Sequence, residues 1–404
     1  MQITWAISKP QQRSRWPDHG ASGAKCFRRR GSAGRTTGPA ATHVAAGRTR
    51  LQLVLRLVAI LFCGVPAVCA QVSDYVSPGV CAGCHPAHAS SQARSAHARA
   101  LSAPLEHPLA TAFTPGRDLL RPPRYRFQFG IAGGQFNMAI SDGAASRSMP
   151  VDWAFGAGSQ AITFVSRLST EHYLEHYFSY YPAIRGFGPT PGQTGLRSNT
   201  LDLASGYMYR AGDAVSGIIK CFECHSTGPV QSDSDNRLAP SQLGVRCEAC
   251  HGPGRRHVLA ASAGRQSKAL ISNPGRLSAG QLNQMCGTCH RAAEDGLMAN
   301  PDKAWSVRYQ PIYFAKSQCF LRARGALSCL TCHDSHQPLE RASLDYDKKC
   351  TGCHSSTSHR AKTEKPVGSC VECHMPRVPA QANLAFTNHW IGVYDKENPV
   401  RPRR

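Results

Sequence analysis

One five-residue pattern, C-x-x-C-H, occurs seven times in this 404-residue chain and limits what the chain can fold into. Two thiols three positions apart can add to the two vinyl groups of one haem, and the histidine that follows can bind its iron. The pattern therefore predicts seven covalently attached haem c groups. The predicted attachment residues are Cys81, Cys84, Cys221, Cys224, Cys247, Cys250, Cys286, Cys289, Cys329, Cys332, Cys350, Cys353, Cys370 and Cys373. The predicted iron ligands within the motifs are His85, His225, His251, His290, His333, His354 and His374.

Two other uses of paired cysteines fit this pattern less well. A zinc ribbon also employs C-x-x-C pairs, but it needs no histidine directly after each second cysteine. A disulfide framework would likewise leave the seven histidines unexplained. Haem attachment is the interpretation that accounts for all three residues of every motif.

The spacing of the motifs predicts the organisation of the chain. One motif lies near residue 81, a stretch of more than a hundred residues has none, and six motifs follow from residue 221 onward. The closest motifs begin about twenty residues apart, which is too short for an independent domain. We therefore expect a mainly α and irregular multihaem cytochrome c fold, built around stacked haems, with a small, mostly β haem-free insertion.

The haem-free stretch carries strand patterns. Aromatic and apolar residues alternate on both sides of Gly133 and Gly134, which predicts a hairpin over about 125–140. Residues 151–155 and 161–166 predict two more strands. Elsewhere we expect short helical turns at the motifs, with the longest helix running from His85 through Leu101.

The N-terminal part of the chain has the pattern of a targeting region. Residues 1–50 are basic and show no periodicity, so we expect an extension that is untranslated or disordered, followed by a signal peptide over 51–70. The apolar run at 51–70 is too interrupted for a comfortable membrane span, and no later run reaches membrane-spanning length. The sequence thus predicts export to the periplasm or otherwise beyond the inner membrane. The remaining segments are 71–119 with the first haem, 120–215 as the insertion and loop, and 216–404 as a six-haem domain.

The formal net charge of +22 suggests a nucleic-acid partner only until the signal is removed. Loss of residues 1–70 takes away eleven basic groups and one acid, which leaves +12. The two propionates on each haem would offset most of that surplus. We therefore expect no nucleic-acid binding.

Each haem iron has a second axial position, and nine histidines outside the motifs lie after residue 70. The candidates that we favour most are His97, His257, His336 and His389, followed by His359 and His107. His88, His172 and His176 are the least favoured. His336 lies too close in sequence to His333 to reach the opposite face of the same haem, so it would ligate a neighbouring one. Cys319, the only cysteine after residue 70 outside a motif, is expected to be a buried thiol rather than a haem-edge contact.

Several segments resemble the exported multihaem c-type cytochromes, and more narrowly the group with cytochrome c-552/4-type and doubled C-x-x-C-H domains. They are SAHARAL at 95–101, CEACHGPGRRH at 247–257, the run SQCFLRARGALSCLTCHDSH ending at 336, CVECHMPR from 370, and NHWI at 388–391. The resemblance implies haem binding, electron transfer and axial roles for His97, His257, His336 and His389. It implies no substrate.

Two classes of function remain open. The first is an electron carrier between redox partners, such as a quinol dehydrogenase, a terminal reductase or other cytochromes, acting alone or as a subunit of a larger assembly. The second is a multihaem oxidoreductase that acts on a small nitrogen or sulfur species at one five-coordinate haem. For that enzyme we would look at the first haem, with His172, Tyr173, His176, Tyr177 and Tyr180 as pocket candidates. The alternative interpretation is that these five residues form a packed aromatic strand and line no pocket.

Overall fold

The computed structural model describes residues 74–213, 217–291, 300–339, 343–354, 368–381 and 383–403. All of them belong to one compact unit, Gln71–Arg404. The proposed extension and signal peptide, at 1–70, and His359 lie outside the described residues.

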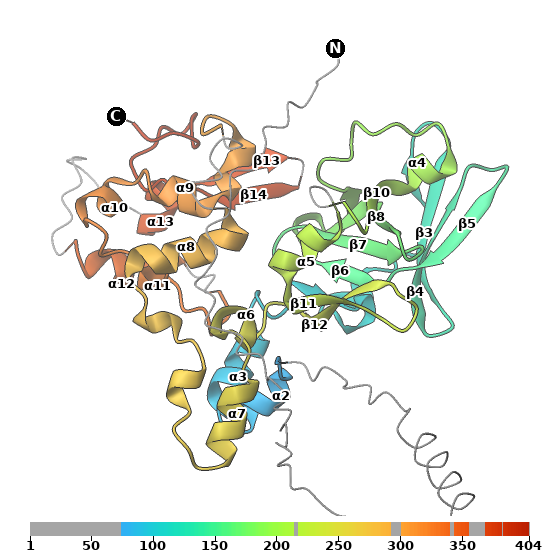
Figure 1. Ribbon diagram of the computed structural model, residues 1–404. Helices are drawn as coiled ribbons and strands as arrows, with labels where there is room; N and C mark the ends of the chain where they lie inside the picture. Colours follow the sequence, from blue (N-terminus) through green and yellow to red (C-terminus); the bar gives the residue numbers. More distant parts are fainter. Residues whose placement is uncertain are drawn as a thin grey trace, which may run out of the picture. The chain divides into compact units, whose positions relative to one another are not determined.

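Fourteen strands are found in the described residues, and they form two larger sheets and two hairpins (Figure 1). The six-stranded sheet has the order β1-β6-β7-β8-β10, with β9 paired to β8, and the four-stranded sheet has the order β2-β3-β4-β5. Both sheets are antiparallel throughout. The strands of the six-stranded sheet are β1 (Leu101–Ser102), β6 (Trp153–Phe155), β7 (Ile162–Arg167), β8 (His172–Tyr181), β9 (Gly186–Pro189) and β10 (Gly206–Arg210). The others are β2 (Leu119–Arg121), β3 (Tyr125–Ala132), β4 (Gln135–Ser141), β5 (Ser146–Pro150), β11 (Ser226–Ser232), β12 (Leu238–Leu243), β13 (Arg377–Gln381) and β14 (Leu384–Thr387).

The α-helices are short, and most of them carry a motif or flank one. They are α2 (Pro78–Ala82), α3 (Pro86–Ala93), α4 (Leu201–Ser205), α5 (Ile219–His225), α6 (Cys247–His251), α7 (Arg255–Ser262), α8 (Ala279–His290), α9 (Gln310–Phe314), α10 (Gln318–Arg322), α11 (Cys329–Cys332), α12 (Ser343–Thr351) and α13 (Cys370–His374). Helices of four to twelve residues are marginal alone, so their stability must come from what they pack against.

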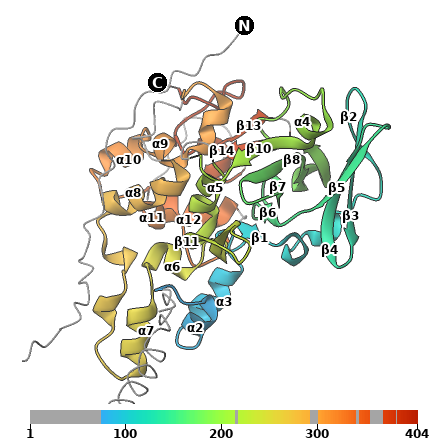
Figure 2. The ribbon, with the colours of Figure 1, turned by 45° about the vertical axis from the view of Figure 1, so that its right-hand side comes forward.

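The two larger sheets share one aromatic core. Phe127 and Met138 of the four-stranded sheet pack in the same buried cluster as Phe164 and Leu174 of the six-stranded sheet. Phe164 is fully buried and makes an edge-to-face contact with Phe113, with ring centroids 5.0 Å apart. The two sheets therefore pack as a sandwich (Figure 2), and the buried cluster of side chains fills the space between them.

The other face of the six-stranded sheet holds a motif helix. Because side chains alternate along a strand, Trp153 and Phe155 of β6 point away from the sandwich interior. They contact Phe222 of α5, the second residue of the motif C-F-E-C-H, at centroid distances of 5.0 and 5.7 Å. The second motif is thus fixed directly against the β sandwich.

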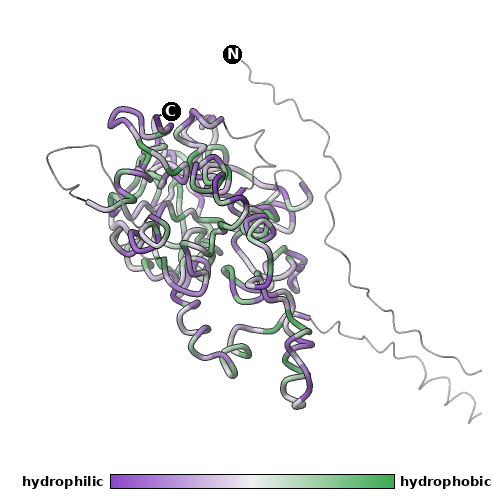
Figure 3. The backbone as a smooth tube through the Cα atoms, turned by 90° about the vertical axis from the view of Figure 1, so that its left-hand side faces the viewer, coloured by the Kyte–Doolittle hydropathy of each residue, from purple (hydrophilic) through white to green (hydrophobic). Residues whose placement is uncertain are grey.

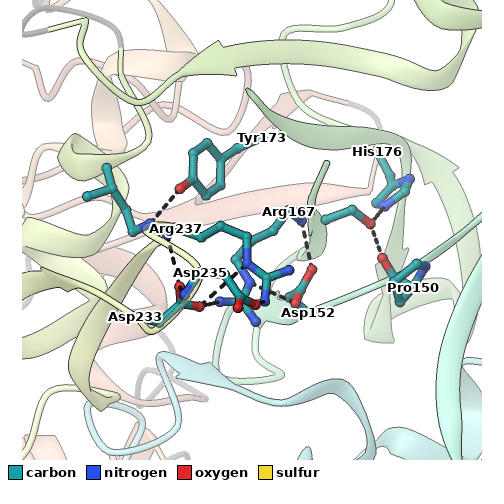
Figure 4. A network of polar contacts seen from close by, with 10 residues as sticks. Pro150, Asp152, Arg167, Tyr173, His176, Asp233, Asp235 and Arg237 are labelled. Atoms are coloured by element: carbon teal, nitrogen blue, oxygen red, sulfur yellow. Dashed lines mark hydrogen bonds and ion pairs between the residues drawn. The ribbon is translucent and has the colours of Figure 1, made fainter. Parts of the chain in front are cut away.

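A polar network also fastens the hairpin that follows α5 (Figure 4). Arg167, at the end of β7, donates to Asp152 at 2.9 Å and to Asp233 at 2.7 Å, in the turn between β11 and β12. The backbone N–H of Leu238 donates to the Tyr173 hydroxyl at 2.7 Å. Since β11 begins where α5 ends, these bonds limit the movement of the second motif.

A third, smaller core lies near the C-terminus, where Val307, Ile312 and Tyr313 pack against Val378. In the part of the chain that the structure describes, apolar and polar stretches alternate closely (Figure 3). Within the described ranges, no helix has the length and apolar character that a membrane crossing requires.

The expected fold class is wrong. The structure is not a mainly α and irregular fold with a small β insertion, because strands form two sheets and two hairpins, and β1, β11, β12, β13 and β14 lie outside residues 120–215. Strands such as β1, with two residues, and β11, with the sequence STGPVQS, are too short or too polar to show an alternating pattern. The helix expected from His85 through Leu101 is also shorter, because α3 ends at Ala93. The hairpin at 125–140 is confirmed as β3 and β4, with Gly133 and Gly134 at φ of 58° and 74°.

Candidate haem-binding sites

Serine caps give two motif helices a defined start. Ser328 and Ser369 stand directly before the first cysteine of α11 and α13, and their backbone N–H groups donate to the side chains of Thr331 and Glu372, at 3.0 and 3.3 Å. Helical geometry from the first cysteine onward puts the two thiols, at positions i and i+3, on one face. One flat ring system can reach both thiols from that side.

Backbone carbonyls orient the histidines. The Nδ1 atoms of His225, His251 and His374 lie 3.0, 2.9 and 2.8 Å from the carbonyls of Ala100, Ser272 and Gly392. The non-motif residues His257 and His389 make the same contact, each at 3.0 Å, with Ser267 and Thr387. A carbonyl only accepts, so Nδ1 carries the proton and the lone pair is on Nε2. This is how metal-ligating histidines are usually held, so these residues fit an iron at Nε2.

Four motif histidines each face a second histidine. The ring centroids lie 6.4 Å apart for His85 and His257, 6.0 Å for His290 and His97, 6.0 Å for His251 and His336, and 6.2 Å for His333 and His389. A nitrogen–metal bond of about 2 Å and about 1 Å from nitrogen to ring centre, counted on both sides, give about 6 Å across one metal ion. The four pairs therefore have the separation that two axial imidazoles on one iron require.

The electrostatic environment keeps several of these rings neutral. Burial lowers the pKa of His97, His290 and His333, and lowers that of His389 to about 4. A neutral imidazole has the lone pair that a metal ligand must offer.

Each of the four pairs joins segments far apart in the chain. His336 follows the fifth motif yet faces His251 of the third, and His257 follows the third motif yet faces His85 of the first. The motif segments are thus interlocked rather than arranged as separate units. His88 packs beside one pair, with its ring centroid 5.1 Å from that of His336.

Thiols of different motifs also lie close together, which gives the motifs a spatial order. The thiols lie close enough to shift one another's pKa in four pairs: Cys81 with Cys247, Cys224 with Cys289, Cys286 with Cys329, and Cys350 with Cys370. Cys250 lies within electrostatic reach of Cys286, and Cys332 within that of Cys353. The order is therefore first, third, fourth, fifth, sixth and seventh, with the second motif beside the fourth.

The other histidine candidates have different surroundings. His107 is buried with both ring nitrogens engaged, at 3.0 Å from the Gly156 carbonyl and 3.0 Å from the Leu109 N–H. This arrangement leaves it no nitrogen for a metal. His176 lies inside the β sandwich, 2.8 Å from the Ser166 hydroxyl, and His172 contacts Ser169.

Among the described residues, no histidine faces His225 as a partner at the iron-spanning distance. Its ring contact there is with Phe155, at 5.3 Å and 69°, on the sheet that carries the second motif. The enzyme hypothesis pointed to the first motif beside the β region, but the second motif occupies that place. Tyr173, His176, Tyr177 and Tyr180 are buried in β8, which is the packed aromatic strand given as their alternative.

One structural residue was not found from the sequence. Glu248, inside the third motif, is almost fully buried and accepts from the N–H groups of Val76 and Gly254, at 2.9 and 2.7 Å. It thereby ties the third motif to the segment before the first. The only signal was an acidic residue between two cysteines.

Cys319, expected to be buried, is partly exposed and lies within electrostatic reach of Cys332 and Cys353.

Comparison with known proteins finds partial similarities to cytochromes. Residues 204–252, which include the second and third motifs, match the family described as cytochrome c554 and c-prime. The chain is also similar to the multihaem cytochrome MtrA of Shewanella baltica (strain OS185), with 25% identity over 186 residues, 39% of this chain and 53% of the relative. The chain thus spans about half the length of this curated relative. The crystal structure of the outer cell wall cytochrome OcwA matches 79% of this chain and 80% of its own chain, with 14% sequence identity and a TM-score of 0.47. This TM-score is too low to support an argument about the fold.

These similarities agree with the motifs on a coarse assignment. The chain resembles multihaem c-type cytochromes, and its motifs together with these similarities support haem c as its cofactor.

Proposed function

We propose that the protein is an exported heptahaem c-type cytochrome that carries electrons between redox partners through a largely bis-histidine-ligated haem array. The observation that carries this proposal is the set of four histidine pairs at centroid separations of 6.0–6.4 Å. Each haem c would supply a one-electron iron couple. The cysteine pairs at 81/84 through 370/373 would hold the seven haems.

The residues of this chain would do three things for such an array. The carbonyl-bound imidazoles would fix the axial geometry, so that little rearrangement accompanies a change of charge. The cross-paired segments would hold neighbouring haems together. The close thiols would set their order, with the second haem branching from the fourth.

The partners that we propose are other redox proteins, such as a quinol dehydrogenase, a terminal reductase or another cytochrome. The order of the motifs supports a conduit with the first and seventh haems at its two ends. Export would follow from the signal peptide proposed at 51–70.

A second candidate function is supported by the surroundings of His225. Among the described residues it has no facing histidine, so a five-coordinate haem at the second motif would give an oxidoreductase site for a small nitrogen or sulfur species. In that case the branch from the fourth haem would deliver electrons to this site.

Two measurements test both candidates. Intact mass should show seven haems, and low-temperature EPR of the oxidised holoprotein should show low-spin signals for the four paired sites. His389→Ala should convert one low-spin haem into a high-spin haem that binds CO when reduced. His172→Ala, at the partly exposed first residue of β8, is the matched control and should leave the low-spin count unchanged.

An unchanged low-spin count in His389→Ala would overturn the proposed pairing of His333 with His389. A full stoichiometric high-spin signal in the unaltered protein would favour the oxidoreductase over the carrier.

A further inference from the structure

A carboxylate without a charged partner lies close to the second motif. Glu175, in the middle of β8, accepts from the Gln193 amide at 2.9 Å and from the Tyr209 hydroxyl at 3.4 Å. No lysine or arginine forms an ion pair with it among the described residues. Burial raises the pKa of Glu175, as expected for a carboxylate held by neutral donors only.

Tyr209 connects this carboxylate to the second motif. Tyr209 and Cys221 pack against the same apolar cluster, which includes Phe222 and Tyr173. Glu175 also lies close enough to Cys221 for its charge to act on the sulfur atom of that residue. Glu175 is therefore within electrostatic reach of the place where a haem joins Cys221.

The other groups that face Glu175 are neutral at ordinary pH. Tyr207 of β10 and Val165 of β7 are the residues paired with Glu175 in the two neighbouring strands, and Tyr209 lies two positions further along β10. Glu175 itself is only partly buried, so protons can reach it from solvent. Glu175 is thus an acid without a basic partner near the second haem, whereas Glu223 of the motif itself is exposed and paired with Lys220 at 3.1 Å.

We propose that Glu175 takes up a proton when the haem held by Cys221, Cys224 and His225 is reduced, while Gln193 and Tyr209 hold its carboxylate. This inference rests on the proposed function, because it requires a haem at the second motif. An electron from a neighbouring haem converts ferric to ferrous iron, and one proton from water joins a carboxylate oxygen. No other bond forms or breaks.

The direction of the coupling follows from charge. Reduction removes one positive charge near Glu175, which destabilises the carboxylate and raises its pKa. The haem potential should therefore fall as pH rises between the two pKa values of Glu175, since the anion stabilises ferric iron. Outside that interval the potential should not depend on this group.

Redox-difference infrared spectroscopy of the holoprotein tests this inference. On reduction, the unaltered protein should gain the C=O stretch of one protonated carboxylic acid, and Glu175→Gln should lose that signal entirely. In the same variant, the pH dependence of one haem potential should disappear. Glu171→Gln, which removes an exposed acid just before β8, is the matched control and should retain both features.

A second variant keeps the test sound if Glu175→Gln does not fold. Tyr209→Phe removes one donor, so the C=O signal should remain but shift in frequency. A signal that persists in Glu175→Gln, that is absent from the unaltered protein, or that does not shift in Tyr209→Phe would overturn the inference. Haem content by intact mass separates this failure from failure of the proposed function: six haems without one at the second motif contradict the latter.

Discussion

The β sandwich and the motif segments of this chain differ in how much apolar side chain they bury. The sandwich, from β1 to β10, encloses a buried cluster of Phe, Tyr, Met and Ile side chains. By contrast, α2, α10, α11 and α13 contain no buried residue, and α6 buries only Glu248. Apolar burial can hold the first region, whereas the second has little of it and, on the proposed function, would be stabilised by the haems attached to its cysteines.

The sharpest way to break this comparison is to withhold haem. When the full chain is made in a host without c-type cytochrome maturation, amides of α11 and α13 should exchange at nearly unprotected rates. Amides of β7 and β8 should stay protected, because their core consists of side chains. Hydrogen exchange with mass spectrometry measures both regions in one sample. Equal protection of α11 with and without haem would contradict the distinction.

A cavity in the sandwich should have the next largest effect. Phe164→Ala removes a fully buried ring that contacts Phe113 and Phe129, and should lower the free energy of unfolding of this region by about 3–5 kcal/mol. The control Ile131→Ala alters a side chain that is 58% exposed and should change it by less than about 0.5 kcal/mol. Denaturant dependence of hydrogen exchange in β8 gives both values. If the two variants were equally stable, the aromatic cluster would not be what holds the sandwich.

Acid should weaken the sandwich through His176. Burial lowers the pKa of this histidine to about 3, against about 6.5 in an unfolded chain. Between these values the unfolded state binds a proton that the folded state does not, so stability falls as pH falls. The slope should reach at most about 1.4 kcal/mol per pH unit. Thermal unfolding of β7 and β8 from pH 7 to pH 4 should show a smaller slope in His176→Leu than in the unaltered protein, and identical slopes would rule out this histidine as the cause.

What could be predicted from the sequence depended on whether the signal was local. The hairpin of β3 and β4 was predictable because alternation and the turn glycines lie within sixteen residues, Tyr125 to Ile140. The motif helices were equally accessible, since thiol spacing and capping serines are adjacent. The fold class was not, because β1 becomes a strand only through its distant partner β6, and β11 is too polar to show an alternating pattern although its partner β12 follows it directly. The role of Glu248 depends on Val76, far away in sequence, and left no local pattern.

Two of the histidine pairs have a consequence for biogenesis, namely His85 with His257 and His97 with His290. A chain made from its N-terminus contains both earlier histidines long before the later ones exist, and the whole β sandwich is synthesised in between. On the proposed pairing, the haem of the first motif would keep one axial side exposed until His257 is made. Closing so long a loop carries an entropic cost that grows only slowly with its length. Early formation of the sandwich would shorten the effective loop and bring the late segments back to the start of the chain.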